Sequence, residues 1–221
     1  MTNQAPFSVV EKNKRINNID IATLYLRKNT MSKKAKTLNE RELRRVLDYI
    51  ATRKHNARNK AMLMTTFLSG MRVGEVASLR FKDVLDVEHN VRREIRLTPE
   101  MTKGSEARIV FVNERLRKEL QNYIKSVNPQ DLNQKLFYSQ KRASDGFTAN
   151  TLTQYFHYLY RRAGVDGASS HSGRRTFITN LASKGVSVRV LMNLAGHKSI
   201  STTQAYIDIN DNMLRSAVEL V

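Results

Sequence analysis

Residues 84–112 read VLDVEHNVRREIRLTPEMTKGSEARIVFV, and their apolar residues are spaced differently from those in the rest of the chain. In Val91–Leu97 apolar residues alternate with charged ones, and Ala107–Val112 is rich in β-branched residues, as strands are. Val84–Val87 is a further short candidate strand. Turn-forming residues separate these segments, at His89-Asn90 and at Lys103-Gly104-Ser105. The stretch therefore predicts a small antiparallel sheet.

Helical patterns flank this stretch on both sides. Before it, Thr37 followed by Glu40 predicts a capping box ahead of a first helix, and a second apolar helix over residues 57–68 stops at Gly70. After it, capping residues and helical spacing predict helices that start near Asn113, Thr148, His171, Ser187, Ser201 and Asp211. The predicted fold class is α+β, mainly α with a small antiparallel β-sheet, in one domain over residues 37–221.

The charge balance indicates a polyanionic partner. The 221 residues include 38 Lys and Arg against 20 Asp and Glu, for a net charge of +18. Such an excess favours nucleic acid. An anionic membrane surface fits less well, because no basic amphipathic segment carries exposed apolar anchors. Aromatic residues make up 7% of the chain, so we expect binding to the backbone of duplex DNA rather than stacking on single strands.

Several classes of protein are excluded by composition. The chain has no cysteine, which rules out disulfides, thiolate metal sites and thiol nucleophiles. It contains no apolar run near the roughly 20 residues that span a bilayer, and no apolar segment suited to a signal peptide. We therefore expect a soluble protein of the cytoplasm with no membrane association.

Residues 1–36 form a basic segment ahead of the predicted domain. Eight Lys and Arg against two acidic residues give it a charge of +6 (8 − 2). It holds too few apolar residues for a core of its own. We expect a basic N-terminal arm that docks on the main domain, wraps DNA or stays a disordered tail.

Two arginines are candidate anion ligands. His171 and Arg174 share a helix face that continues into the core, where a guanidinium needs an anion or a carboxylate as partner. Arg72 lies at a break between two helices, with Glu75 one helical turn further on. The alternatives are an internal Arg–Glu pair for Arg174 and an ordinary surface ion pair between Arg72 and Glu75.

Three further residues complete the candidate set. Lys103 lies at a hairpin tip, where a lysine reaches a ligand or is simply solvated. His197 follows the helix-ending Gly196, and Tyr206 comes nine residues later (206 − 197). Taken alone, such a tyrosine is more often a packing residue and such a histidine a structural one. The histidines have no third ligand at metal-binding spacing, so we expect no metal and no cofactor.

Together these side chains are those that phosphoryl transfer on DNA without a metal requires. Two guanidiniums can hold the non-bridging oxygens of a phosphate and stabilise the charge of the transition state. A tyrosine hydroxyl, with a pKa of about 10, becomes a nucleophile when a base accepts its proton. A lysine or histidine can protonate the departing 5′ oxygen.

The order of these residues resembles that of the tyrosine recombinase, or phage integrase, family. The matching segments occur in family order across residues 37–221, namely Ser69–Glu75, Thr102-Lys103-Gly104, His171-x-x-Arg174, Ala195-Gly196-His197 and Ser199–Tyr206. The resemblance implies the family's catalytic-domain fold. It also implies a site-specific DNA recombinase, of integrase, excisionase or invertase type, that cuts and rejoins duplex DNA through a 3′-phosphotyrosine without metal or ATP.

The resemblance further implies a role for each candidate residue: Arg72 and Arg174 hold the scissile phosphate, Glu75 supports Arg72, Lys103 is the general acid, His171 the general base, His197 a hydrogen-bond donor to the transition state, and Tyr206 the nucleophile. It implies a homo-oligomer, a tetramer, on DNA, in which the C-terminal helix, residues 211–221, contacts a neighbouring protomer. Packing of that helix on its own core is the alternative. The resemblance also implies a protein that is encoded by a bacterium or phage, belongs to a mobile genetic element and is associated with the nucleoid.

The chain departs from the family pattern in two respects. Gly173 stands where a larger apolar residue is usual, and Arg175 where a histidine is common. The family's N-terminal DNA-clamping domain has no counterpart ahead of residue 37, so we expect either a naturally short recombinase or a piece of a longer one. Two other functions stay open, a DNA-binding regulator or accessory protein without cleavage, and a type IB topoisomerase that relaxes DNA.

Overall fold

The computed structural model describes residues 34–139, 146–209 and 211–220. The chain divides into two compact units, residues 1–34 and 35–221, and the description below concerns the second unit. Most of the predicted basic arm lies outside the described residues, so that assignment stays a prediction.

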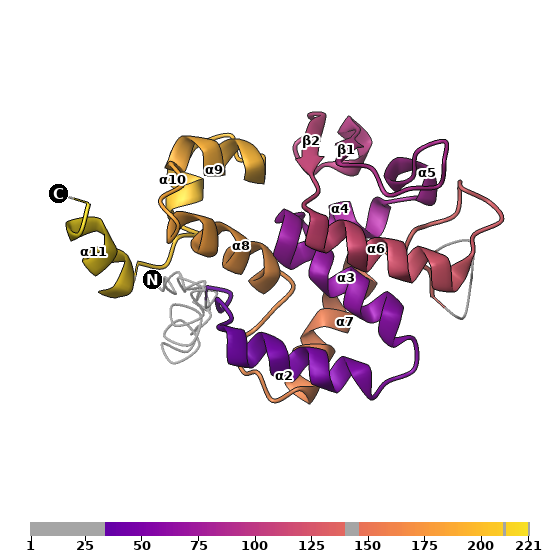
Figure 1. The fold of residues 1–221 in the computed structure, drawn as a ribbon, viewed down its shortest axis with the longest axis horizontal. Coiled ribbons are helices and arrows are strands. Elements are labelled where there is room, and N and C mark those ends of the chain that lie inside the picture. The colour runs from indigo at the N-terminus through magenta and orange to yellow at the C-terminus, as the bar shows by residue number, and fades with distance from the viewer. Residues whose placement is uncertain (1–33, 140–145, 210, 221) are drawn as a thin grey trace, which may run out of the picture. The chain divides into compact units, whose positions relative to one another are not determined.

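Helix α3 (Asn56–Ser69) is central to this unit, and it packs against α2, α4, α6 and α8 (Figure 1). Most of its residues are buried, because neighbours cover it on several sides. The elements before the sheet are α2 (Glu40–Ala51), α3, α4 (Val73–Ser78) and α5 (Phe81–Val84). The helices after it are α6 (Glu114–Val127), α7 (Ala149–Arg162), α8 (Ser172–Ala182), α9 (Val188–Ala195), α10 (Ile200–Gln204) and α11 (Asp211–Val218). The mainly helical prediction is confirmed.

The start of α2 differs from the prediction by two residues. The Asn39 side chain accepts a hydrogen bond from the Glu42 backbone N–H at 2.9 Å, and the Glu42 carboxylate accepts one from the Asn39 N–H at 3.1 Å. This is a capping box, but the one predicted from Thr37 was wrong. The Thr37 hydroxyl instead donates to Asp208, far along the chain.

The sheet has two strands. Strand β1 (Glu94–Leu97) pairs antiparallel with β2 (Arg108–Phe111), and Ile95 lies opposite Val110. Both of these side chains are buried, as the alternating pattern predicts. The third candidate strand, Val84–Val87, was wrong: its first residue ends α5, and its second forms only an isolated bridge. The Asp83 carboxylate caps α5 by accepting from the Arg80 N–H at 2.8 Å, which favours a helical turn there.

Gly173 allows α8 to approach α3 closely. A Cβ at this position would lie 2.1 Å from Thr66 Oγ1 and 2.7 Å from Thr66 Cβ, well inside contact distance. A larger apolar residue would push the two helices apart. The departure from the family pattern therefore accompanies a tight contact between α3 and α8.

Tyr206 lies beyond α10 rather than on it. The helix begins after Ser199, whose hydroxyl accepts from the Thr202 N–H at 3.3 Å, so the start predicted at Ser201 was wrong. It ends at Gln204, and Tyr206 follows in a turn. Its ring packs against a small cluster of buried residues on α8 and α9, namely Ile178, Leu191 and Ala195. None of the helices in the described segments is long and apolar enough to cross a membrane.

Candidate functional site

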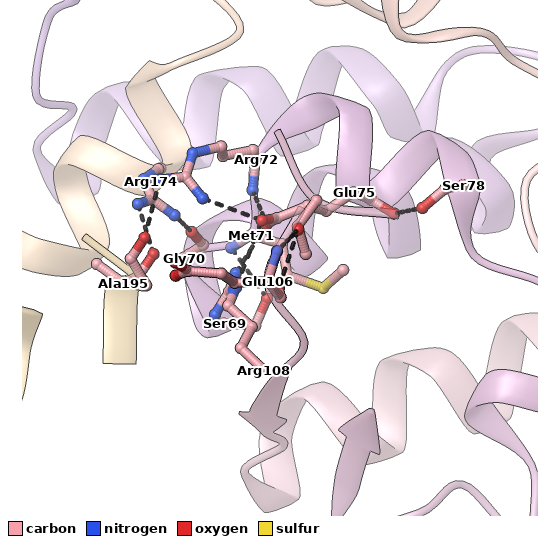
Figure 2. A network of polar contacts seen from close by, with 12 residues as sticks. Ser69, Gly70, Met71, Arg72, Glu75, Ser78, Glu106, Arg108, Arg174 and Ala195 are labelled. Carbon is pink, nitrogen blue, oxygen red and sulfur yellow. Dashed lines mark hydrogen bonds and ion pairs between the residues drawn. The ribbon is translucent and has the colours of Figure 1, made fainter. Parts of the chain in front are cut away.

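A buried carboxylate organises one side of the site. Glu75 is 1% exposed and accepts hydrogen bonds from the Arg72 backbone N–H (2.7 Å), from Arg72 Nη1 (3.1 Å) and from Arg108 Nη2 (2.7 Å) (Figure 2). Burial alone would raise the pKa of Glu75, but the hydrogen bond and charge of Arg108 outweigh it, and the net pKa is lowered. Glu75 is thus a charged anchor for two arginines, not a member of a surface ion pair.

Three arginines bind successive carbonyls at the end of α9. The C-terminal carbonyls of a helix lack intrahelical partners and carry the negative end of its dipole. Each accepts from a different guanidinium: Leu194 O from Arg108 Nη1 at 3.0 Å, Ala195 O from Arg174 Nη2 at 2.6 Å, and Gly196 O from Arg72 Nη2 at 3.1 Å. The end of α9 therefore gathers the side chains of Arg72, just before α4, Arg108 on β2 and Arg174 on α8, and Figure 2 shows the bond between Arg174 and Ala195.

Gly196 makes this convergence possible. It is in the left-handed region at φ 62°, and a Cβ there would lie 2.6 Å from Arg108 Cδ. A side chain would both strain the backbone and displace Arg108. The glycine that ends α9 thus also leaves room for the arginine cluster.

Arg174 is the most deeply buried cation of the cluster. It is 1% exposed, and its Nη1 donates to Gly70 O at 2.6 Å. Its Nε is buried without a hydrogen-bond partner among the described residues. Burial and the charges of Arg72 and Arg108 lower the pKa of Arg174 to about 9, although Glu75 opposes the shift. The predicted alternative of an internal Arg–Glu pair is not seen for Arg174 as a hydrogen bond or ion pair in the described segments, and a nearby anion would offset the repulsion among the arginines.

His197 and Tyr206 lie beside Arg174. The His197 ring is 8% exposed, and its Nδ1 is 2.9 Å from Thr203 Oγ1. The ring centroids of His197 and Tyr206 are 5.0 Å apart, and the guanidinium carbon of Arg174 is 5.7 Å from the Tyr206 ring centroid. Burial, together with Arg174 and Arg72, lowers the pKa of His197 to about 4. The imidazole is therefore neutral near pH 7.

Lys103 and His171 lie at the margin of the cluster. Lys103 is exposed in the turn before β2 and lines a cleft of about 460 Å³ together with Arg72 and His197. His171 is the N-cap residue of α8. The residue as a whole is exposed, but desolvation of its ring and the charges of Arg174, Arg72 and Lys103 lower the pKa of His171, which favours the neutral imidazole. The structure therefore brings all seven predicted site residues to one region: Arg72, Glu75, Arg174, His197 and Tyr206 by direct contact, and Lys103 and His171 at its edge.

Arg108 was missed by the sequence reasoning, although a signal was present. It alternates with Val110 and Val112, which are buried, so the strand pattern puts it on the inward face of β2. A charge at an inward position needs a partner. In the structure that partner is Glu75, 33 residues away along the chain.

Arg175 and Asp208 were likewise not predicted as a pair. Arg175 Nε donates to Asp208 Oδ2 at 2.9 Å, and Arg175 Nη2 donates to Asp208 Oδ1 at 2.5 Å. No local pattern marks this contact, because 33 residues separate the partners. No cluster of three or more His, Asp or Glu suited to a metal ion occurs in the part of the chain that the structure describes.

Comparison with known proteins gives a consistent set of likenesses. The profile of the phage integrase family matches residues 36–213. Tyrosine recombinase XerA of Pyrococcus furiosus is 26% identical over 184 residues, which are 83% of this chain and 61% of the relative. A crystal structure of XerA recombinase has a TM-score of 0.69 at 28% identity and covers 84% of this chain and 64% of that one.

A more distant structure shares the fold. The integrase of transposon Tn1549, solved with a circular intermediate DNA, has a TM-score of 0.66 at 21% identity, over 86% of this chain and 67% of that one. The chain thus spans less than two thirds of the length of XerA, whether compared by sequence (61%) or by structure (64%).

Proposed function

The chain belongs to the phage integrase family, and from this premise we propose that it is the catalytic part of a site-specific DNA recombinase. The proposed reaction cuts and rejoins duplex DNA through a 3′-phosphotyrosine, with neither metal nor ATP in the chemical steps. One observation carries the proposal: the buried guanidinium of Arg174 lies beside Tyr206 and the other arginines, and its Nε has no hydrogen-bond partner among the described residues. A scissile phosphate is an anion that fits this environment.

Arg72 and Arg174 are the proposed phosphate ligands. Both already have one guanidinium nitrogen bound to the end of α9, and Glu75 fixes the other end of Arg72. Preorganised guanidiniums stabilise charge on the non-bridging oxygens without reorganising during the reaction. Arg108 adds positive charge to the same region but is held by Glu75.

The proposed chemistry is a pair of in-line displacements. The Tyr206 oxygen attacks phosphorus while its proton passes to a base, for which we propose His171. The bond from phosphorus to the 5′ oxygen breaks, and Lys103 gives that oxygen a proton. A 5′ hydroxyl from another strand then reverses the sequence, so the energy of the broken bond is kept in the phosphotyrosine.

The protonation states expected for His171 and His197 suit the roles that we propose for them. The lowered pKa of His171 makes it a proton acceptor at pH 7. For His197 to donate from Nε2 to the phosphate, its Nδ1 must be the acceptor, and Thr203 must donate to it. The contact at 2.9 Å between Nδ1 and Thr203 Oγ1 permits that arrangement.

We propose duplex DNA and further copies of the same chain as partners. The net charge of +18 supports a polyanion. Helix α11 has no buried residue, and Leu214 and Val218 on it are 58% and 71% exposed. This supports contact between α11 and a neighbouring protomer of a DNA-bound tetramer, in preference to packing on its own core.

The test is formation of a covalent adduct. Purified protein is incubated with a pool of nicked duplexes of randomised sequence, and denaturing gels reveal DNA that stays attached. We expect an adduct with wild type and with the control Tyr158→Phe, which changes an exposed tyrosine on α7, and none with Tyr206→Phe.

The outcomes separate the rival functions. DNA binding without any adduct in wild type would indicate a regulator or accessory protein. An adduct that persists in Tyr206→Phe would refute the assignment of the nucleophile. Adding a duplex with a free 5′ hydroxyl should give recombinant strands, whereas plasmid relaxation alone would indicate a topoisomerase.

A further inference from the structure

Arg175 occupies an unusual position next to the proposed phosphate ligand. It follows Arg174 on α8, is 5% exposed, and uses both Nε and Nη2 to bind the Asp208 carboxylate. Its guanidinium carbon is 6.0 Å from the centroid of the Tyr206 ring. The hydrogen bond with Asp208 raises the pKa of Arg175 although burial opposes this. Arg175 is therefore turned to the protein and not to an external anion.

Asp208 joins three separate parts of the fold. It lies two residues after Tyr206, and besides Arg175 its carboxylate accepts from the Thr37 hydroxyl, ahead of α2. A carboxylate that receives a bidentate guanidinium has a defined orientation. The segment after Tyr206 is thus tied both to α8 and to the chain before α2.

Thr179 anchors the same segment by its backbone. Its hydroxyl donates to Tyr206 O at 3.0 Å and lies 3.4 Å from the Asp208 N–H. Because α10 ends at Gln204, no continuing helix fixes the tyrosine. Its N–H still donates to Thr203 O at 3.0 Å within the turn, and its tertiary contacts converge on α8, the helix that carries Arg174.

We propose that Arg175 and Asp208 are a positioning pair that holds Tyr206 against Arg174 of the same chain. This inference rests on the proposed function, in which Tyr206 attacks a phosphate held by Arg174. A displacement of about 1 Å in a reacting group costs on the order of 100-fold in rate. The pair acts on the rate of cleavage and not on the affinity for DNA.

The decisive variant is Asp208→Asn. An amide is isosteric with the carboxylate, but it offers one oxygen and one NH2 group, so it cannot accept from Arg175 Nε, Arg175 Nη2 and the Thr37 hydroxyl as the carboxylate does. Asp208→Glu keeps the charge and tests for rescue. Glu114→Gln is the matched control, because Glu114 also receives two bonds from one arginine, Arg117, on α6 (2.9 and 3.1 Å).

The first measurement is single-turnover cleavage of a nicked duplex selected by wild type, with the dissociation constant for the same duplex. We expect Asp208→Asn to cleave about 10- to 100-fold more slowly, while its dissociation constant stays within about twofold of wild type. Asp208→Glu should recover part of the rate, and Glu114→Gln should match wild type. An Asp208→Asn protein that cleaves at the wild-type rate would overturn the proposal.

Arg175→Gln separates positioning from direct phosphate binding. If Arg175 positions Tyr206, this variant loses cleavage rate to the same extent as Asp208→Asn, and the double variant loses no more than either single one. Loss of DNA affinity by Arg175→Gln, with Asp208→Asn unaffected, would mean that Arg175 contacts DNA and would also overturn the proposal.

A second measurement does not depend on catalysis. Fluorotyrosine is incorporated in the whole chain, and the ¹⁹F signal of Tyr206 is assigned with Tyr206→Phe. Without DNA, the Tyr206 signal should be shifted or narrowed in Asp208→Asn relative to wild type. In Glu114→Gln it should be the same as in wild type. An unchanged signal in Asp208→Asn would refute the positioning role even if wild type proved unable to cleave DNA, whereas a missing adduct alone would count only against the proposed function.

Discussion

Protonation of His197 should make the free protein lose stability on acidification. The ring is buried among Arg174, Arg72 and Arg108, with Glu75 as the facing carboxylate. These surroundings lower its pKa in the folded state to about 4, from an ordinary value of 6.5. Between these two values the unfolded chain binds a proton at this site and the folded protein does not. The contribution of His197 to the free energy of unfolding is therefore fully present above pH 6.5 and decreases as the pH falls toward 4.

The size of the effect follows from the two pKa values. With 4 in the folded state and 6.5 in the unfolded state, linkage gives a loss of about 2 kcal/mol between pH 8 and pH 5. The lowered pKa of Glu75 adds little in this range, because an ordinary glutamate titrates near 4.5. The lowered pKa of His171 also makes the free energy of unfolding decrease on acidification. This contribution remains in His197→Asn.

The assay is urea unfolding at pH 5, 6, 7 and 8 for wild type, His197→Asn and the control His157→Asn, an exposed histidine on α7. Wild type and the control should lose about 2 kcal/mol more than His197→Asn between pH 8 and pH 5. Equal pH dependence in wild type and His197→Asn would refute the reasoning, as would a wild type that is stabilised by acid.

Two further predictions concern residues behind the proposed phosphate site. Glu75→Gln should lower the free energy of unfolding by about 3 to 5 kcal/mol, because it leaves buried arginines without their counter-charge; a loss as small as that of the exposed Glu114→Gln in urea unfolding would contradict the anchoring role. Thr203→Val should slow single-turnover cleavage by about 10-fold or more without weakening DNA binding, since in the proposed reaction the hydroxyl sets the His197 tautomer that donates to the phosphate. Thr203→Ser should restore the rate, and a valine variant as fast as wild type would show that the tautomer is set otherwise.

Helix starts illustrate what local sequence can predict. The side chains of Asn113, Thr148 and Ser187 accept hydrogen bonds from backbone N–H groups three residues ahead, as their positions predicted. A cap depends on residues within one turn, so the sequence contains the necessary information. The error at the start of α2 has a tertiary cause, because Thr37 is drawn to Asp208 while Asn39 caps the helix.

The candidate residues were predictable, and their connections were not. Arg72, Arg174, His197 and Tyr206 were chosen from residue type, spacing and family resemblance. Nothing local indicated that Arg72 would bind Gly196 O across 124 residues of chain. The bond forms because the end of α9 lies beside the start of α4, and this placement is decided by packing of the helices on one another.

The sequence by itself determined the kinds of side chain available, most of the longer helices and the alternation that makes β2 a strand. Only the tertiary structure decided that Arg108 faces Glu75, and that three guanidiniums share the carbonyl end of α9. It also decided that Asp208 ties the turn after Tyr206 to α8. The physical reason is the range of the interactions: caps and periodicity act within a few residues, whereas a buried charge is stable only where distant segments bring it a partner.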